Sequence, residues 1–293
     1  MQIEPGRPDG KKFYQLLTGS IAPRPIAFAS TMDKGGNPNL SPFSFFNGFG
    51  SNPATLIFSP MRRVRNNTIK HTLGNIHETM EVVINTVNYD MVQQVSLSSC
   101  EYPREVNEFV KSGLTPVPSV LVKPYRVKES PVSFECKVKQ IIETGDKGGA
   151  GNLIICEAIL IHVKDEVMDE NGYINPHKID LVGRMGLNYY CRASGNAVFE
   201  VPKPNTELGI GFDSLPESVR KSNILSGNDL GMLANVTEIP VIDPAFEDVQ
   251  LKNIIQYYST NPEDMEIELH YYAKKLLEQN RVRDAWQVLL AGA

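Results

Sequence analysis

One basic stretch of the sequence carries the side chains best suited to binding a phosphate. The segment "RRVRNNTIKHTLGNI" supplies Arg62, Arg63 and Arg65, followed by Lys70 and Thr72 at the start of an expected helix. The first turn of a helix has unpaired amides and a partial positive charge. An ammonium and a hydroxyl beside those amides would hold a phosphate well. An ordinary helix start beside a solvated basic loop explains the same residues, and the residues alone favour that simpler interpretation.

A second group of polar side chains lies in "NLSPFSFFN", which sets Ser41, Ser44 and Asn47 among three phenylalanines. Short polar side chains in a packed strand need hydrogen-bond partners. They either line a pocket for a flat polar heterocycle or bond the backbone at a bulge made by Pro42. Beside the phosphate-binding segment, they favour a phosphorylated flat cofactor.

The usual signatures of other chemistries are absent from the sequence. It contains no GxxxxGK[ST], GxSxG or HExxH motif. The segment "GDKGGAG" is followed by a strand pattern, which argues against a dinucleotide fingerprint. The four cysteines form no CxxC pair and the five histidines are scattered, so we expect reduced thiols and no metal site.

Composition restricts the class of protein. The chain has 293 residues, 22% charged residues and a formal net charge of -5, without a run of lysine or arginine. That balance argues against nucleic-acid binding. The N-terminus lacks the apolar segment of a signal peptide, and no apolar run approaches the about 20 residues that span a bilayer. We therefore expect a cytoplasmic protein with no membrane segment.

The elements that would position these residues are mostly strands. Apolar runs bounded by turn residues predict strands over 24–31, 39–46, 54–60, 80–87, 125–145 and 153–168. Helical patterns are few in this half and fall at 70–80 and 90–100. This pattern predicts a mainly β barrel or sandwich.

The pattern changes to helices near residue 205, at "VPKPN". We place one domain at residues 1–205 and a C-terminal α-helical extension at 206–293. Helices are expected over 213–223, 226–236, 248–259 and 262–292, and Ser214 and Glu217 have capping-box spacing at the first of them. The last helix has an apolar stripe with Trp286, which either packs inward or binds a partner. Packing on the barrel or against a second subunit is the favoured interpretation.

Several motifs in order resemble the flavin reductase-like family. These are "YQLLTGSIAPRPIAFASTMDKGGNPNLSPFSFFNGFGSNPATLIFSP", "KHTLGNI", "YPREVNEFVKSGLTPVPS", "ESPVSFECKV" and "GRMGLNYYCR". The resemblance runs from about residue 14 to about residue 204. It implies a mainly β fold, the FMN-binding split β-barrel with few helices. It also implies a homodimer with non-covalent FMN near the subunit interface.

The resemblance also implies which residues contact FMN. They are Arg24, Pro25, Ser41, Pro42, Phe43, Ser44, Asn47, Ser51, Lys70, Thr72, Asn188 and Tyr189, with Tyr190 beside them. The "KHT" segment corresponds to a Lys-Asp-Thr phosphate segment of the family, so His71 stands in place of an acid. Lys70 and Thr72 keep their implied role, and the role of the middle residue stays open. No residue is assigned a catalytic role.

The implied activity is hydride transfer from NAD(P)H to FMN. A flavin accepts the hydride while the protein orients the reactants, so no acid–base dyad is required. The alternative is an FMN-containing electron-transfer protein, similar to flavoredoxin, that does not oxidise NAD(P)H directly. Either function would involve an electron acceptor, which could be another protein.

Overall fold

The computed structural model describes residues 2–4, 10–202 and 207–292 of the chain. The chain divides into two compact units, Met1–Phe199 and Glu200–Ala293. The boundary expected after residue 205 lies outside the described residues.

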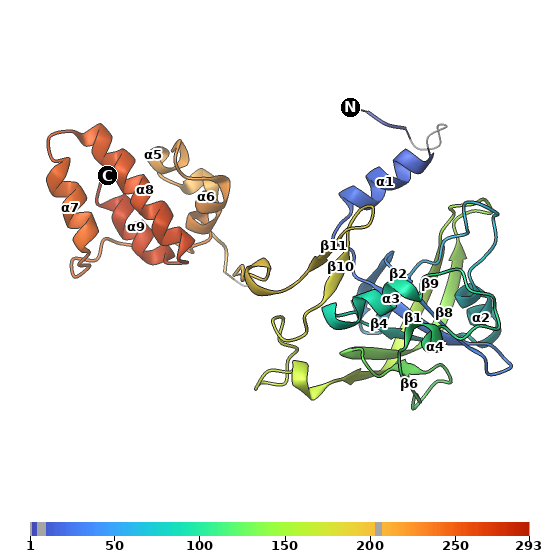
Figure 1. Ribbon diagram of the computed structural model, residues 1–293. Coiled ribbons are helices and arrows are strands. Elements are labelled where there is room, and N and C mark those ends of the chain that lie inside the picture. The colour runs from blue at the N-terminus through green and yellow to red at the C-terminus, as the bar shows by residue number, and fades with distance from the viewer. Residues whose placement is uncertain (1, 5–9, 203–206, 293) are drawn as a thin grey trace. The chain divides into compact units, whose positions relative to one another are not determined.

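A seven-stranded antiparallel sheet forms the centre of the first unit (Figure 1). Its strands, in spatial order, are β2 (Pro38–Phe43), β1 (Ala27–Met32), β5 (Glu81–Asn85), β8 (Val132–Glu143), β9 (Asn152–Val163), β4 (Ala54–Phe58) and β3 (Phe46–Ser51). The mainly β prediction for this half of the chain is confirmed.

The sheet order requires the sheet to curl. Strands β2 and β3 lie at opposite ends of the order, yet only Ser44 and Phe45 join them. From Phe43 to Phe46 the chain can span at most about 11 Å. The two outer strands must therefore approach each other, which is the geometry of a partly closed barrel.

The stretch "NLSPFSFFN" is thus not one strand, contrary to the sequence-based expectation. Strand β2 pairs with β1, whereas β3 pairs with β4, and the chain changes direction at Ser44 and Phe45. The amide of Ser59 donates a 2.9 Å hydrogen bond to the carbonyl of Phe45 and fixes the corner. Ser41, Ser44 and Asn47 therefore do not share one face of a strand.

Both faces of strand β1 are buried, which explains its nearly continuous apolar sequence. Ala27 and Ala29 pack in a cluster with Leu73 and Ile76 of helix α2 (His71–Thr79). Phe28 belongs to a second cluster, which covers the other face. That cluster includes residues of helices α3 (Val92–Leu97) and α4 (Glu108–Ser112).

Smaller elements complete the first unit. Helix α1 (Gly10–Ser20) precedes the sheet and was not predicted, whereas the helices expected at 70–80 and 90–100 correspond to α2 and α3. Strands β6 (Pro116–Val117) and β7 (Arg126–Val127) form one short pair. Strands β10 (Val182–Arg184) and β11 (Tyr190–Arg192) form another, which carries the "GRMGLNYYCR" motif.

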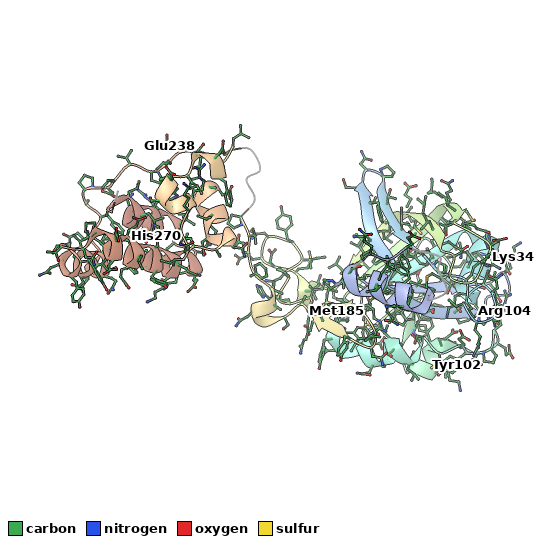
Figure 2. The ribbon with its side chains drawn as sticks, turned by 90° about the horizontal axis from the view of Figure 1, so that it is seen from above. Lys34, Tyr102, Arg104, Met185, Glu238 and His270 are labelled. Carbon is green, nitrogen blue, oxygen red and sulfur yellow. The ribbon has the colours of Figure 1, made fainter. Side chains whose placement is uncertain are left out.

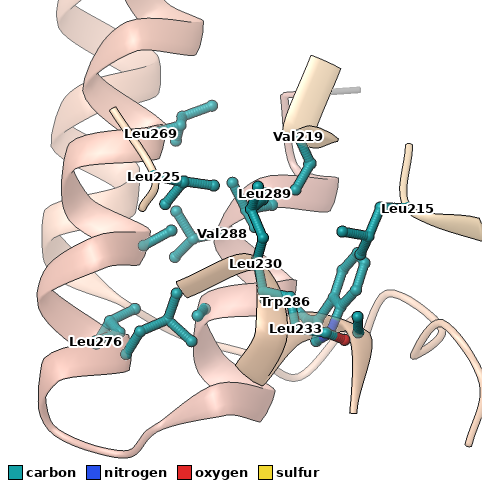
Figure 3. Close-up of a cluster of buried hydrophobic side chains, with 14 of the residues drawn as sticks. Leu215, Val219, Leu225, Leu230, Leu233, Leu269, Leu276, Trp286, Val288 and Leu289 are labelled. Carbon is teal, nitrogen blue, oxygen red and sulfur yellow. The ribbon is translucent and has the colours of Figure 1, made fainter. Parts of the chain in front are cut away.

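The second unit is helical and has its own hydrophobic core (Figure 3). Its helices are α5 (Glu217–Arg220), α6 (Gly227–Ala234), α7 (Val249–Tyr257), α8 (Pro262–Glu278) and α9 (Val282–Leu290). Trp286 is fully buried in this core, where its indole nitrogen donates a 3.3 Å hydrogen bond to the carbonyl of Leu233. The apolar stripe therefore packs within its own unit, and Trp286 is not available to bind a partner.

The capping box expected at Ser214 and Glu217 is not formed. The N-cap residue of helix α5 is Pro216, and no side chain caps the helix by a hydrogen bond. Ser214 belongs to the preceding 3₁₀ turn instead. The capping box of this unit lies instead at the start of α6, where the side chains of Ser226 and Asp229 bond each other's backbone amides.

The sequence led us to expect no membrane-spanning segment, no metal site and no disulfide. No helix in the described residues is long and apolar enough to cross a membrane, and the cytoplasmic location stays a prediction. The same residues contain no group of three metal-ligating side chains. All four cysteines are free thiols; Cys136 and Cys156 are buried, whereas Cys100 is exposed.

Candidate functional site

The basic loop between β4 and α2 is held in place by the turn between β8 and β9. The amide of Arg62 donates to the carbonyl of Ala150 (2.9 Å), and the amide of Gly149 donates to the carbonyl of Arg62 (3.0 Å). A Cβ on Gly148 would lie 3.0 Å from backbone atoms of Arg63 and Val64, so the approach requires glycine. The long hairpin therefore decides where the arginines of this loop lie.

Arg63 is a fixed cation of the loop. Its Nη1 atom donates to the Thr68 hydroxyl (3.0 Å) and to the Ile69 carbonyl (2.6 Å). Its Nε atom forms a 3.1 Å ion pair with Glu101, and its side chain is 14% exposed. Three partners of a mostly buried guanidinium fix its position.

Lys70, the N-cap residue of helix α2, carries an unpaired charge. Its ammonium has no hydrogen-bond or ion-pair partner in the part of the chain that the structure describes. Burial lowers the pKa of Lys70, the neighbouring Arg63 lowers it further, and Glu101 acts in the opposite direction. An anion bound beside this half-buried ammonium would offset the cost of its burial.

The first backbone amides of α2 also lack hydrogen-bond partners. Among the described residues, the amides of His71 and Thr72 have no acceptor, since the bonds of the first turn begin with Leu73 and Gly74. Thr72 is 1% exposed, and its Oγ1 accepts a 2.9 Å hydrogen bond from Nδ2 of Asn39 on β2. Its hydroxyl proton remains free for an anion.

His71, which replaces the acid of the family segment, adds no charge of its own near neutral pH. Burial lowers its pKa, and Arg63, Arg104 and Lys70 lower it further. Arg104 lies beside Lys34 at one edge of the first unit, where it pairs with Glu78 at 3.1 Å (Figure 2). A neutral His71 ring does not add to the repulsion among these three cations, whereas a charged ring would.

These groups line two adjoining depressions of the first unit. The small cleft has a volume of ≈ 20 Å³ and is lined by Asn39, Ser41, Arg63, Lys70, His71, Thr72, Ser98, Cys100, Glu101, Tyr102 and Glu108. The large hollow has a volume of ≈ 490 Å³ and is lined by Tyr14, Pro42, Phe43, Ser44, Phe45, Ser59, Met61, Arg62, Arg63, Val64, Arg65, Lys70 and Glu101. Arg63, Lys70 and Glu101 belong to both.

Six of the twelve predicted cofactor-binding residues line these two depressions. Ser41 and Thr72 line the small cleft, Pro42, Phe43 and Ser44 line the large hollow, and Lys70 lines both. The corner between β2 and β3 is what turns these neighbouring residues toward two depressions. The polar strand end and the helix start therefore lie side by side, and their contact with a flavin stays a prediction.

Arg24 borders the large hollow without lining it. Its side chain is buried and donates to the carbonyls of Thr18, Ile21 (2.6 Å) and Met185 (2.8 Å). Its Nε atom also donates to the Ser44 hydroxyl at 3.4 Å. Arg24 is thus occupied with protein partners, Ser44 among them, and its contact with a flavin stays a prediction.

The remaining predicted residues do not line either depression. Pro25, Asn47 and Ser51 are exposed, and Oδ1 of Asn47 accepts from the adjacent Gly48 amide (2.8 Å). Asn188 and Tyr189 are exposed in the turn between β10 and β11. Their contact with a flavin stays a prediction.

The sequence analysis missed two residues that line the site, Asn39 and Glu101. Asn39 positions Thr72, and Glu101 pairs with Arg63. Asn39 could have been found by the argument used for Ser41, because it is a short polar side chain in the same predicted strand. Glu101 could not, because an acidic residue in an exposed loop carries no local signal. Only the fold brings its carboxylate to Arg63, 38 positions earlier in the chain.

Residues 19–192 match the family described as flavin reductase like domain. An uncharacterized protein of Aquifex aeolicus is 41% identical over 193 residues, which are 66% of this chain and 96% of that protein. The family match lies within the first unit.

Solved structures agree on the fold. Nitrilotriacetate monooxygenase component B from Bacillus cereus is similar with a TM-score of 0.63 and 28% identity, over 69% of this chain and 98% of that chain. A protein with a split barrel domain from Shewanella frigidimarina gives a TM-score of 0.58 and 26% identity, over 69% and 99% of the two chains. The first unit therefore has the split-barrel fold, and the second unit is a helical extension to it.

Proposed function

Because the chain belongs to the flavin reductase-like family, we propose that it is an FMN-dependent oxidoreductase that takes a hydride from NADH or NADPH. The family supports flavin binding and redox chemistry, while the choice of FMN and of a nicotinamide donor is our proposal.

The observation that carries the proposal is the unpaired ammonium of Lys70. It lies at the junction of the two depressions, beside the fixed guanidinium of Arg63 and the free amides of His71 and Thr72. A phosphate monoester carries about -1.5 to -2 charges at neutral pH and has three acceptor oxygens. The donor set therefore fits the phosphate of FMN.

The large hollow fits the rest of the molecule. Its volume lies within the range of about 300–1,000 Å³ that is usual for small-molecule sites. Pro42, Phe43 and Phe45 supply apolar walls, and Ser44 and Ser59 supply hydroxyls. Since Ser44 accepts from Arg24, its own proton is available to a ring or ribityl oxygen.

Bound FMN would supply the two-electron chemistry, with N5 as the hydride acceptor. Lys70, Arg63 and Thr72 would fix the phosphate end, and Ser44 would orient the opposite end. Residues that fix both ends of the flavin would orient it toward a nicotinamide donor, and such positioning can supply much of the rate. We assign no residue as a proton donor or acceptor for this step.

We also propose that the chain is a homodimer with the flavin site near the subunit interface. Among the described residues, one edge of β9 pairs with β8 along the strand, whereas the other edge pairs with β4 only over residues 154–157 and has no strand partner at 158–163. That edge is apolar, and Ile161 is 50% exposed. An uncovered apolar edge favours association with a second copy. Sedimentation equilibrium of the full chain tests this proposal, and a monomer at micromolar concentration contradicts it.

Anaerobic titration of the purified protein with NADH and NADPH tests the activity. We expect bound FMN to lose its visible absorbance with one of the two donors. A second titration with added FMN separates a retained cofactor from one that exchanges. Protein that binds no flavin and oxidises neither donor in the presence of FMN would disprove the proposal.

The same experiment addresses the alternative function. Protein that retains FMN, leaves NADH and NADPH unoxidised and accepts electrons from a reduced protein donor would be an electron carrier. In that case a partner protein would be required on both sides of the reaction.

A further inference from the structure

The carboxylate of Glu101 is bound to the arginines at the proposed phosphate site. Oε1 is 3.1 Å from Nε of Arg63, and Oε2 is 3.0 Å from an Nη atom of Arg65. Glu101 also lines both depressions together with Arg63 and Lys70. An anion of the protein itself therefore lies at the proposed phosphate site.

The two sides of this ion pair differ in freedom. Arg63 is mostly buried and keeps its bonds to Thr68 and Ile69 if Glu101 leaves. The Glu101 side chain is 44% exposed, and its partner Arg65 is 82% exposed. The exposed pair with Arg65 contributes little stability. The carboxylate that leaves Arg63 is already partly in water, so it can move away while the buried cation stays.

The exchange of anions would free cations for the ligand. Arg63, Arg65 and Lys70 carry three positive charges, and the Glu101 carboxylate neutralises one of them, while Lys70 lacks a partner among the described residues. Displacing Glu101 releases both arginines toward the roughly two negative charges of a phosphate monoester near neutral pH. The amides of His71 and Thr72 stay available in either case.

We propose that Glu101 is an internal competitor for the flavin phosphate and weakens the binding of phosphorylated flavin. This inference rests on the proposed function, because it concerns the FMN site. FMN binds by displacing the Glu101 carboxylate from Arg63 and Arg65. The competitor lowers the affinity for FMN and leaves that for riboflavin, which lacks the phosphate, unchanged. Such a site favours a flavin that exchanges over one that is held permanently.

The test compares FMN and riboflavin on the flavin-free full chain by isothermal titration. The variants are Glu101→Gln, which keeps the shape and removes the charge, and Glu217→Gln as control. Glu217 is likewise an exposed, ion-paired carboxylate, bonded to Lys221 at 2.6 Å in the second unit. Thermal melting checks that each variant is folded.

We expect E101Q to bind FMN about tenfold more tightly than the wild type, with riboflavin affinity unchanged. The E217Q variant should match the wild type with both ligands. Unchanged or weaker FMN binding by E101Q overturns the inference, because Glu101 would then be neutral or a flavin ligand. Equal tightening of FMN and riboflavin also overturns it, since the phosphate would not be the cause.

Failure of the proposed function has a different signature. If neither the wild type nor E101Q binds FMN or riboflavin, the flavin site itself is wrong and the inference falls with it. If the wild type binds FMN and E101Q shows no gain, the inference about Glu101 alone is wrong.

Discussion

Asn39 donates a 2.9 Å hydrogen bond from Nδ2 to Oγ1 of Thr72, and so ties strand β2 to the first turn of helix α2. Both side chains are buried, and both line the small cleft. One interaction thus joins the polar strand and the helix start that would hold the two ends of the flavin.

Replacement of Thr72 by valine should weaken FMN binding and destabilise the first unit. Valine keeps the shape but removes the shorter of the two hydrogen bonds of the Asn39 amide and leaves only the 3.4 Å bond to the Thr31 hydroxyl, at a cost of about 1–3 kcal/mol. Thr72→Ser is the matched control, because it keeps the hydroxyl. Denaturant unfolding and FMN titration measure the two effects. Equal FMN affinity in T72V and T72S would show that the hydroxyl plays no part in binding.

Replacement of Lys70 by methionine should reduce FMN affinity and leave riboflavin affinity unchanged. Loss of a hydrogen bond to a charged group costs about 1.5–3 kcal/mol, or roughly ten- to a hundredfold in affinity. The fold should not suffer, because the ammonium has no partner among the described residues and burial lowers its pKa. Lys128→Met, at an exposed lysine that lines neither depression, serves as control. A similar loss for riboflavin would place Lys70 elsewhere in the site.

Replacement of Gly148 by alanine should disturb the cation site from a distance. The added Cβ would meet Arg63 O and Val64 Cα at 3.0 Å, so the basic loop must shift and carry Arg63 with it. We expect weaker FMN binding with little change in riboflavin binding. Gly74→Ala, where nothing lies within 4 Å, is the control and should gain about 0.5–1 kcal/mol of stability. Wild-type FMN affinity in G148A would refute the dependence of Arg63 on the hairpin turn.

The second unit should lose stability as the pH falls below the ordinary histidine pKa. The Ser222 hydroxyl accepts from the amides of Ile224 and Leu225 and therefore donates to Nδ1 of His270 at 2.9 Å, which requires a neutral ring. Burial lowers the pKa of His270 from its usual 6.5, and Glu266 opposes this weakly. His270 lies among the helices of the second unit (Figure 2).

The sign follows from proton linkage. The unfolded chain binds a proton near pH 6.5 that the folded unit rejects until a lower pH. Stability from this group is therefore complete above pH 6.5 and declines as the pH falls toward the lowered value. We expect His270→Gln to be less stable than the wild type at pH 7.5, with a smaller loss between pH 7.5 and 5.5. Thermal melting at both pH values measures this, and an unchanged pH dependence in H270Q would contradict it.

Local patterns in the sequence sufficed for several parts of the protein. Turn residues and apolar runs indicated the strands around the centre of the sheet, and the change of pattern near residue 205 indicated a helical extension. The chemistry of Lys70 and Thr72 at a helix start was also readable, because residue type and spacing determine what the first turn of a helix can bind.

Tertiary structure decided the rest. Whether Ser44 continues a strand or turns a corner depends on the partners of β2 and β3, which lie at opposite ends of the sheet order. Residues far apart in the chain are joined by the ion pair of Glu101 with Arg63 and by the hydrogen bond from Arg24 to Ser44. A local pattern reports the propensities of neighbouring residues, whereas these contacts exist only once the sheet has curled and its loops have met.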